Sequence, residues 1–191
     1  MNVAVVVEGP SDGASYPVLM QKIRGDLEVS QLRECGGKSK LKNVFPSFLK
    51  EFQRNHAWQI DIAFVIRDSD CAASQEVEEQ LRNVLDRSGF KPNLTVEFFA
   101  VKCDLETWLL ADEHAINHVS SRRGKNKQVG AAKIRFEADR NAKEIFLEQL
   151  SKVDLRADPQ VYREIANSVD IARIAALCPS FRRFITKIRA C

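Results

Sequence analysis

The spacing of hydrophobic positions changes along the chain, and up to residue 113 apolar runs alternate with amphipathic stretches. Apolar runs typical of strands buried in a sheet lie at 3–7, 60–66 and 94–101, with a weaker one at 28–34. Apolar residues at helical spacing lie between them, at 16–23, 41–52 and 77–85. In the first of these helices, Ser15 as N-cap would place Pro17 in the first turn, where proline is tolerated. The alternation predicts an α/β fold with a mostly parallel sheet flanked by helices.

Beyond residue 113 the apolar spacing is helical only. Short helices are predicted around Tyr162 and around Ile174, and Pro179 is expected to open a last helix. The apolar face of that last helix is expected to cover the sheet; it is formed by Phe181, Phe184, Ile185 and Ile188. The pattern therefore divides the chain into an α/β domain, 1–113, and a helical extension with a basic loop, 114–191.

At 191 residues and 45% hydrophobic content, the chain is long enough to bury a substantial core. Its net charge of +3 neither requires nor excludes a nucleic-acid partner, so the local distribution of charge must decide. The N-terminus has no basic segment, and its apolar run is too short to span a membrane or direct export. A cytoplasmic protein without membrane association is therefore expected.

The chain has five cysteines, and no two of them form a CxxC pair. An odd number without that spacing is more typical of a reduced cytosolic protein than of a disulfide scaffold. Cys35, Cys71 and Cys103 each follow a predicted strand, which could bring them near one another, but their spacing is not that of zinc ligands. Free thiols are therefore expected.

Acidic residues gather where the predicted strands end. Glu8 ends the first strand, and Asp68 and Asp70 end the third. Ligands of open α/β sheets bind outside the carboxyl ends of the strands. Carboxylates without histidine or thiolate partners suit a hard cation such as Mg²⁺ or Mn²⁺. A metal ion between Asp68 and Asp70 would also remove the repulsion between two charges so close in sequence.

Several of these acids have a second interpretation, because an acid just after a strand often caps the next helix. Asp12 and Asp104 are more simply interpreted as helix caps, and Asp70 can be one as well. Glu106 lies in the first turn of the helix predicted over LETWLLADE, where it can complement the helix dipole. Glu8 is harder to explain in this way, because glutamate is rarely an N-cap.

The stretches VVVEGPSD and FVIRDSD resemble the Toprim domain, the catalytic fold shared by topoisomerases, bacterial primases and the overcoming-lysogenization-defect (OLD) nucleases. That family has a glutamate after its first strand and a DxD motif after its third, places that Glu8, Asp68 and Asp70 occupy. Its nuclease branch adds a second metal-binding acid four residues after the glutamate. Here that residue is Asp12, where glutamate is usual.

The later segments CGGKSKL, DLETWLLAD and CPSFRRF resemble a compact bacterial Toprim-like family that is often linked with phage-defence ATPases. The resemblance assigns Glu106 to the site. It implies a Mg²⁺- or Mn²⁺-dependent nuclease that cleaves DNA, or RNA, as the effector of an antiviral defence system with an ATPase partner. Glu8, Asp68 and Asp70 would be catalytic, and these three would hold the metal together with Asp12 and Glu106.

Two basic segments are candidates for contact with the nucleic-acid backbone. Residues 114–136 contain no acid, and a solvated loop is the simplest interpretation of such a charge run. Beside a phosphodiester-cleaving site, however, it would bind phosphates. The glycine pair of CGGKSK would let backbone amides meet a phosphate, although an ordinary strand-to-helix turn has the same pattern. The residues expected to contact phosphate are Lys38, Lys40, Arg122, Arg123, Lys125 and Lys127. A further basic face, for solubility or for binding, is formed by Arg182, Arg183, Lys187 and Arg189.

Two rival functions have less support. A non-catalytic subunit that docks on an ATPase or on nucleic acid would not need so many carboxylates together. A phosphatase with Asp68 as nucleophile would usually carry its DxD motif after the first strand, with Thr or Val at the position of Ala72.

Overall fold

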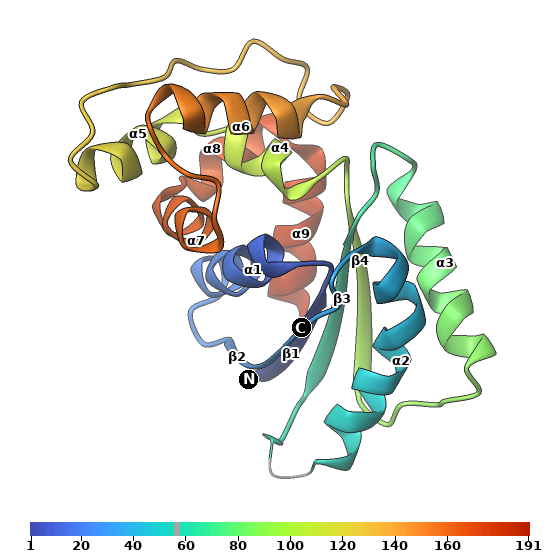
Figure 1. The fold of residues 1–191 in the computed structure, drawn as a ribbon. Helices are drawn as coiled ribbons and strands as arrows, with labels where there is room; N and C mark the ends of the chain where they lie inside the picture. Colours follow the sequence, from blue (N-terminus) through green and yellow to red (C-terminus); the bar gives the residue numbers. More distant parts are fainter. Residues whose placement is uncertain (56–57) are drawn as a thin grey trace.

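The computed structural model describes residues 1–55 and 58–191 and shows a parallel sheet between two layers of helices (Figure 1). All the strand pairs are parallel, and the strand order is β2-β1-β3-β4. The strands are β1 (Asn2–Val7), β2 (Glu28–Glu34), β3 (Ile62–Asp68) and β4 (Thr95–Val101). The predicted α/β class and parallel sheet are confirmed.

The helices are divided unequally between the two faces of the sheet. One face is covered by α2 (Lys38–Arg54) and α3 (Ser74–Arg87), which share a core cluster with the sheet. The other face is covered by α1 (Pro10–Ile23) and α9 (Pro179–Ala190). The remaining helices after β4 pack on this layer and on one another (Figure 1); they are α4 (Leu105–Leu110), α5 (Glu113–Arg122), α6 (Ala142–Lys152), α7 (Pro159–Ser168) and α8 (Ile171–Leu177).

The position of β1 inside the sheet, between β2 and β3, explains why its sequence is continuously apolar. Side chains alternate between the faces of a strand, so Val3, Val5 and Val7 point into the core under the larger helical layer. Ala4 and Val6 point into the core under α2 and α3. Both faces are covered, and residues 3–7 are completely buried. The weak apolar pattern of β2 has the opposite cause, since β2 lies at an edge of the sheet and is mostly half-buried.

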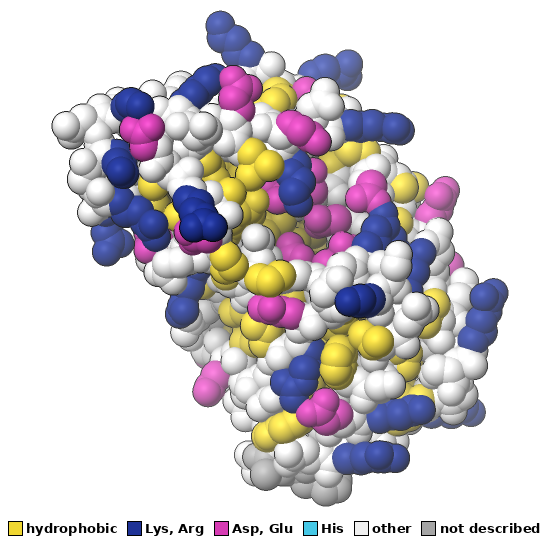
Figure 2. Space-filling model, in the orientation of Figure 1, with side chains coloured by type: hydrophobic (Ala, Val, Ile, Leu, Met, Phe, Trp, Pro, Cys, Tyr) yellow, Lys and Arg dark blue, Asp and Glu magenta, His cyan; other side chains and the backbone are white. Residues whose placement is uncertain are grey.

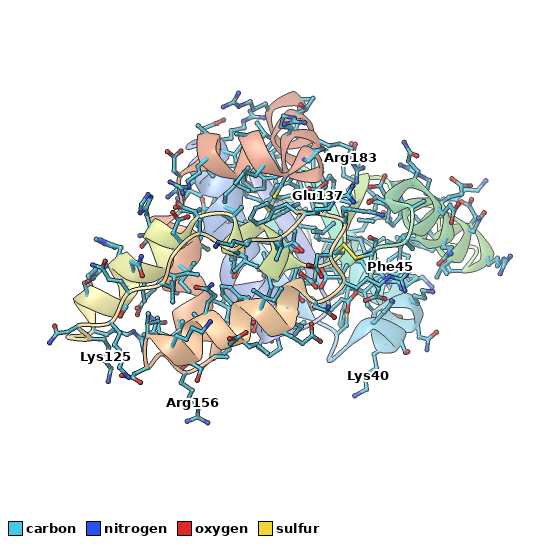
Figure 3. The ribbon with its side chains drawn as sticks, turned by 90° about the horizontal axis from the view of Figure 1, so that it is seen from above. Lys40, Phe45, Lys125, Glu137, Arg156 and Arg183 are labelled. Carbon is cyan, nitrogen blue, oxygen red and sulfur yellow. A yellow bond between two sulfur atoms is a disulfide. The ribbon has the colours of Figure 1, made fainter. Side chains whose placement is uncertain are left out.

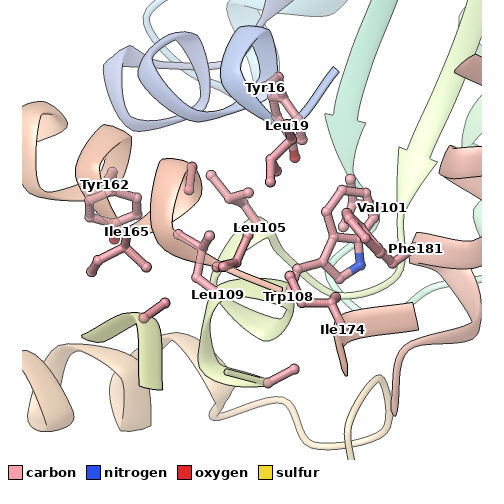
Figure 4. Close-up of a cluster of buried hydrophobic side chains, with 14 of the residues drawn as sticks. Tyr16, Leu19, Val101, Leu105, Trp108, Leu109, Tyr162, Ile165, Ile174 and Phe181 are labelled. Carbon is pink, nitrogen blue, oxygen red and sulfur yellow. The ribbon is translucent and has the colours of Figure 1, made fainter. Parts of the chain in front are cut away.

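The larger core joins the two ends of the chain through aromatic side chains (Figure 4). Trp108 packs against the rings of Tyr16, Phe181 and Phe184, and its indole N–H donates a hydrogen bond to Oγ of Ser180, 2.9 Å away. The α9 side chains Phe181, Phe184 and Ile188 are completely buried, and Ile185 is half-buried. The prediction that this apolar face covers the sheet is confirmed.

The first helix begins earlier than it would with Ser15 as its N-cap. α1 begins at Pro10, so Pro17 lies inside the helix and not in its first turn. Proline at the first helical position has the right φ and needs no hydrogen bond there. Asp12 then accepts a hydrogen bond from the Gly9 N–H at 3.0 Å and caps the helix. Further along, a Cβ atom on Gly13 would lie 2.4 Å from Oε1 of Glu34, so this glycine lets α1 approach the end of β2 closely.

Two helices of the C-terminal part were not predicted individually. α5 spans the first part of the acid-free segment, so Arg122 lies at a helix end and not in a loop. α6 follows that segment and contributes Ala142, Phe146 and Leu150 to the core. None of the described helices is long and apolar enough to cross a membrane.

Candidate acidic site at the carboxyl ends of the strands

Acidic side chains from several segments meet at the carboxyl ends of β1, β3 and β4. In Figure 2 they occupy a hollow in the middle of the face shown, with Lys and Arg side chains on its rim. Parallel strands end at the same edge of a sheet, which is why residues distant in sequence converge here. The group consists of Glu8, Asp12, Asp68, Asp104 and Glu106, whose charges act on one another.

Glu8 and Asp68 are joined directly. The backbone N–H of Asp68 donates a hydrogen bond to Oε1 of Glu8 over 3.3 Å, so the end of β3 is fixed to the end of β1. The Nε atom of the buried Arg67 lies 3.6 Å from the same oxygen. Burial raises the pKa of Glu8 above its usual value, and the Arg67 charge and the hydrogen bond from Asp68 oppose that increase.

Asp12 belongs to the site while it also caps α1. Its Oδ2 atom accepts the hydrogen bond from the Gly9 N–H. Burial, together with the charges of Glu106 and Glu8, raises the pKa of Asp12 to about 7, although the Gly9 hydrogen bond favours the charged form. The two interpretations of Asp12 are therefore compatible, because one oxygen caps the helix and the carboxylate still faces other acids.

Asp68 places a buried carboxylate oxygen in the middle of this group. Its Oδ1 atom is buried and has no hydrogen-bond partner among the described residues. Burial, followed by the charges of Asp12, Glu106 and Glu8, raises the pKa of Asp68 well above its usual value. A buried carboxylate oxygen without a donor is costly. In this environment the charged form of Asp68 needs a cation beside it.

Asp104 and Glu106 are brought to the site by α4. Asp104 accepts a hydrogen bond from the Thr107 N–H at 2.9 Å, which confirms that it caps this helix. Burial and the nearby charge of Glu106 raise the pKa of Asp104. Glu106 is 3% exposed and faces the same hollow, so its position in a first helical turn does not leave it on the surface.

Three residues of the site were not found from the sequence. The Lys143 ammonium lies 3.0 Å from Oε1 of Glu106, and the Tyr162 hydroxyl donates a hydrogen bond to the same oxygen at 2.8 Å. Burial alone would lower the pKa of Lys143, but the surrounding carboxylates outweigh it and raise the pKa. The buried Tyr16 hydroxyl has no partner among the described residues, and its pKa is raised by burial and by Asp68. These residues come from three helices without a local motif.

Asp70 does not join the buried group. Its side chain is 61% exposed and forms an ion pair with Lys38. Its backbone has a φ of 47°, in the left-handed region. The adjacent Ser69 is 2% exposed, so the DxD motif changes from buried to exposed within two residues.

The donor chemistry of the group suits a hard divalent cation, because every candidate ligand is a carboxylate oxygen. The pKa values of Glu8, Asp12 and Asp68 are all raised, chiefly by burial, so the charged forms of these carboxylates are disfavoured unless a positive charge lies beside them. Within residues 1–55 and 58–191, however, no three acidic, histidine or cysteine side chains are close enough to hold a metal ion as they stand. A metal would therefore require these side chains to move closer together.

The predicted phosphate-binding residues fall in separate regions. Figure 3 shows Lys125 at one end of the molecule, well away from Lys40. Lys38 lies beside the site, where burial and the charge of Arg67 lower its pKa and the charges of Glu8 and Asp68 oppose that decrease. The Gly37 N–H donates to the carbonyl oxygen of Glu8 at 2.8 Å, so it is not free for a phosphate.

The other basic residues differ in whether they already have partners. Arg123 donates two hydrogen bonds to Glu164, and Lys127 forms an ion pair with Asp154 at 2.9 Å. Arg122 and Lys125 are exposed, and they form no ion pair with another described residue. On α9, two of the basic side chains are bound within the protein: Arg183 pairs with Glu78, and Lys187 with Glu97. The basic face of α9 is therefore partly neutralised.

The expectation of free thiols is wrong for two cysteines. Cys71 and Cys103 form a disulfide, drawn in yellow in Figure 3. The strand ends were expected to bring these cysteines near one another, and β3 and β4 are indeed neighbours, but the odd number of cysteines without a CxxC pair favoured free thiols. Cys35, Cys178 and Cys191 are free.

Fold and site together define an α/β protein with a carboxylate cluster at the carboxyl ends of parallel strands. The chain belongs to the DUF4276 family, a domain of unknown function, which matches residues 7–189. No curated protein matches it. Among solved structures, the chain is similar to the C-terminal region of the Burkholderia pseudomallei OLD protein, with 13% identity and a TM-score of 0.46, over 98% of this chain and 96% of that one. So distant a likeness carries no argument about function, and the Toprim resemblance stays a prediction.

Proposed function

We propose that this protein is a Mg²⁺- or Mn²⁺-dependent nuclease that hydrolyses phosphodiester bonds of DNA, or of RNA, at the acidic site. The observation that supports this most is the buried Oδ1 atom of Asp68, which has no hydrogen-bond partner in the part of the chain that the structure describes and lies among four further carboxylates. Carboxylates collected in this way destabilise the folded protein unless a positive charge balances them. Such an arrangement is more typical of an ion-binding site than of a structural core.

Glu8, Asp12, Asp68 and Glu106 would hold the metal, and the DxD motif assigns Asp70 to the same task. The metal would supply a lower pKa for the attacking water and would stabilise the charge that develops on the phosphate. Glu8 would act either as a ligand or as the base that accepts the water proton.

Two cations of the chain would orient the substrate. Lys143 and Lys38 lie next to the carboxylates, so each would contact a phosphate oxygen that approaches the site. The raised pKa of Lys143 keeps this group positively charged at neutral pH.

The proposal is tested with DNA and RNA substrates incubated with the protein in Mg²⁺, Mn²⁺ or a chelator. Cleavage should require the metal and should fall by at least about 100-fold in Asp68→Asn, since even the partners of metal ligands contribute about 10–100-fold. Asp86→Asn is the matched control, because Asp86 lies exposed on α3. Equal cleavage by Asp68→Asn and the parent would exclude this site as the catalytic one.

The role in antiviral defence and the ATPase partner have their support in the sequence resemblance alone, and the cytoplasmic location in the N-terminal sequence and the cysteine content. Co-purification from the native host, with activity measured with and without the purified partner, tests whether the protein acts with an ATPase partner. The non-catalytic alternative predicts partner binding without cleavage under any metal condition, and partner binding that is unchanged in Asp68→Asn.

A further inference from the structure

The Cys71–Cys103 disulfide links two of the segments at the acidic site, the loops that follow β3 and β4. Cys71 directly follows Asp70 in the loop after β3, and Cys103 directly precedes Asp104 in the loop after β4. Two hydrogen bonds accompany the link. The Asp70 N–H donates to the Cys103 carbonyl at 3.0 Å, and the Cys103 N–H donates to Oγ of Ser69 at 3.1 Å.

The linked segments have an unfavourable backbone conformation. Asp70, Cys71 and Cys103 have φ values of 47°, 63° and 64°, in the left-handed region that residues other than glycine seldom adopt. Each such residue costs roughly 1 kcal/mol or more, so something must hold it in place. The disulfide is the covalent restraint present. In the conformation that it maintains, the Asp70 side chain points to Lys38 and solvent, away from the buried carboxylates.

We propose that this disulfide is a redox-sensitive site that determines whether Asp70 can join the metal-binding carboxylates. In the oxidised form Asp70 remains in its ion pair with Lys38. In the reduced form Cys71 is free to leave the left-handed conformation, and Asp70 turns toward Asp68. The inference rests on the proposed function, because it assumes that the acidic site takes a divalent metal.

The co-reactant is a dithiol reductant, and the step is thiol–disulfide exchange. Cys71 is half-buried and Cys103 is 1% exposed, so the reductant's thiolate attacks the Cys71 sulfur and Cys103 leaves as a thiolate. The second thiol of the reductant then displaces Cys71. Both cysteines end as thiols with two electrons and two protons gained, and the reductant ends as a disulfide.

Reduction would not release the loop entirely. The Lys102 ammonium donates hydrogen bonds to the carbonyl oxygens of Cys71 and Ala72, at 2.7 and 2.8 Å. These contacts do not depend on the disulfide, so they keep the loop against the end of β4. The change is therefore confined to the few residues around Asp70.

The test compares the oxidised parent, the parent reduced with a phosphine, and a Cys71→Ser/Cys103→Ser variant, with Cys191→Ser as control. Mn²⁺ affinity is measured by calorimetry, and amide hydrogen exchange is followed at residues 69–72 and 102–104. Reduced parent and serine variant should bind Mn²⁺ at least about tenfold more tightly than the oxidised parent, because even a residue that only supports a metal ligand changes the affinity by about 10–100-fold. Exchange should be faster in both segments, and Asp70→Asn should remove the gain in affinity.

Equal affinity and equal exchange in the oxidised and reduced forms would overturn the inference, as would a gain in affinity that survives Asp70→Asn. A peptide map of the oxidised protein without the Cys71–Cys103 link would overturn it as well. Absence of Mn²⁺ binding in every form would instead show that the metal-dependent function is wrong, and its redox control with it.

Discussion

The Lys143 ammonium lies 3.0 Å from Oε1 of Glu106, so α6 contacts the acidic site at the carboxyl ends of the strands. The Tyr162 hydroxyl, from α7, donates to the same oxygen at 2.8 Å. Two helices beyond the predicted boundary at residue 113 thus take part in the environment of Glu106. The helical part therefore does more than cover the sheet, because it determines the charge balance of the site.

Replacement of Lys143 by methionine should destabilise the protein at pH 8, because a buried carboxylate loses its cation. The expected loss is about 1–3 kcal/mol in the free energy of unfolding, measured by denaturant titration, since Lys143 itself is 54% exposed and the pair is partly screened. In a Glu106→Gln background the same replacement should cost much less. Equal costs in both backgrounds would mean that Lys143 acts through packing and not through its charge.

The sequence predicted the parts of this structure that depend on local patterns. The run at 3–7 predicted β1 because the strand is buried on both faces, and Asp104 was a recognisable cap because its contact with Thr107 is only three residues away. Lys143 and Tyr162 have no such signal. Their contacts with Glu106 span 37 and 56 residues, and only the packing of α6 and α7 creates them.

Two features of the structure differ from what the sequence pattern indicated. Pro17 was given too much weight as a helix boundary, whereas Pro10 and the Asp12 contact with Gly9 set the start of α1. The Cys71–Cys103 link was not predicted because cysteine number and spacing do not show which strand ends are neighbours, and β3 and β4 are the two that bring this pair together.

Asp68→Asn should stabilise the protein at pH 8 and not at pH 4. The folded-state pKa of Asp68 is raised, so its stability contribution is complete below the unfolded value near 4 and is lost as the pH rises through the folded pKa. Asparagine does not ionise, so the variant does not lose this stability as the pH rises. One pKa unit corresponds to about 1.4 kcal/mol, and a gain above about 1 kcal/mol is expected, or roughly 2–4 °C in the melting temperature. Asp86→Asn is the control, and a lower melting temperature for Asp68→Asn at pH 8 would contradict the prediction.

Mn²⁺ affinity should increase as the pH rises from 6 to 8. Asp12, with a pKa near 7, is protonated below that pH and has to release its proton before it can bind a cation. Release of one proton gives about a tenfold change in affinity per pH unit below the pKa. Calorimetry at several pH values measures this, and Asp12→Asn should flatten the curve. A pH-independent affinity in the parent would show that Asp12 does not take part in metal binding.

The salt dependence of nucleic-acid binding should distinguish the basic residues near the end of α5 that already have an acidic partner from those that have none among the described residues. Arg123 and Lys127 already pair with Glu164 and Asp154, and the Arg123 hydrogen bonds, with burial opposing, hold the pKa of Glu164 at about 2. Arg122 and Lys125 act on the same two carboxylates only at longer range and form no ion pair with any residue that the structure describes, so they are freer to contact phosphates.

Two double variants test this with an equal change in net charge. Arg122→Ala with Lys125→Ala should reduce the slope of log affinity against log salt by about 0.7 to 0.9 per lost phosphate contact, for all sequences alike. Arg123→Ala with Lys127→Ala should reduce it less, because those cations are partly neutralised by their carboxylate partners. Fluorescence anisotropy with labelled DNA and RNA over a salt series measures both slopes. Equal reductions would indicate a general effect of net charge. An unchanged slope in Arg122→Ala with Lys125→Ala would show that this segment is a solvated surface that does not contact phosphates.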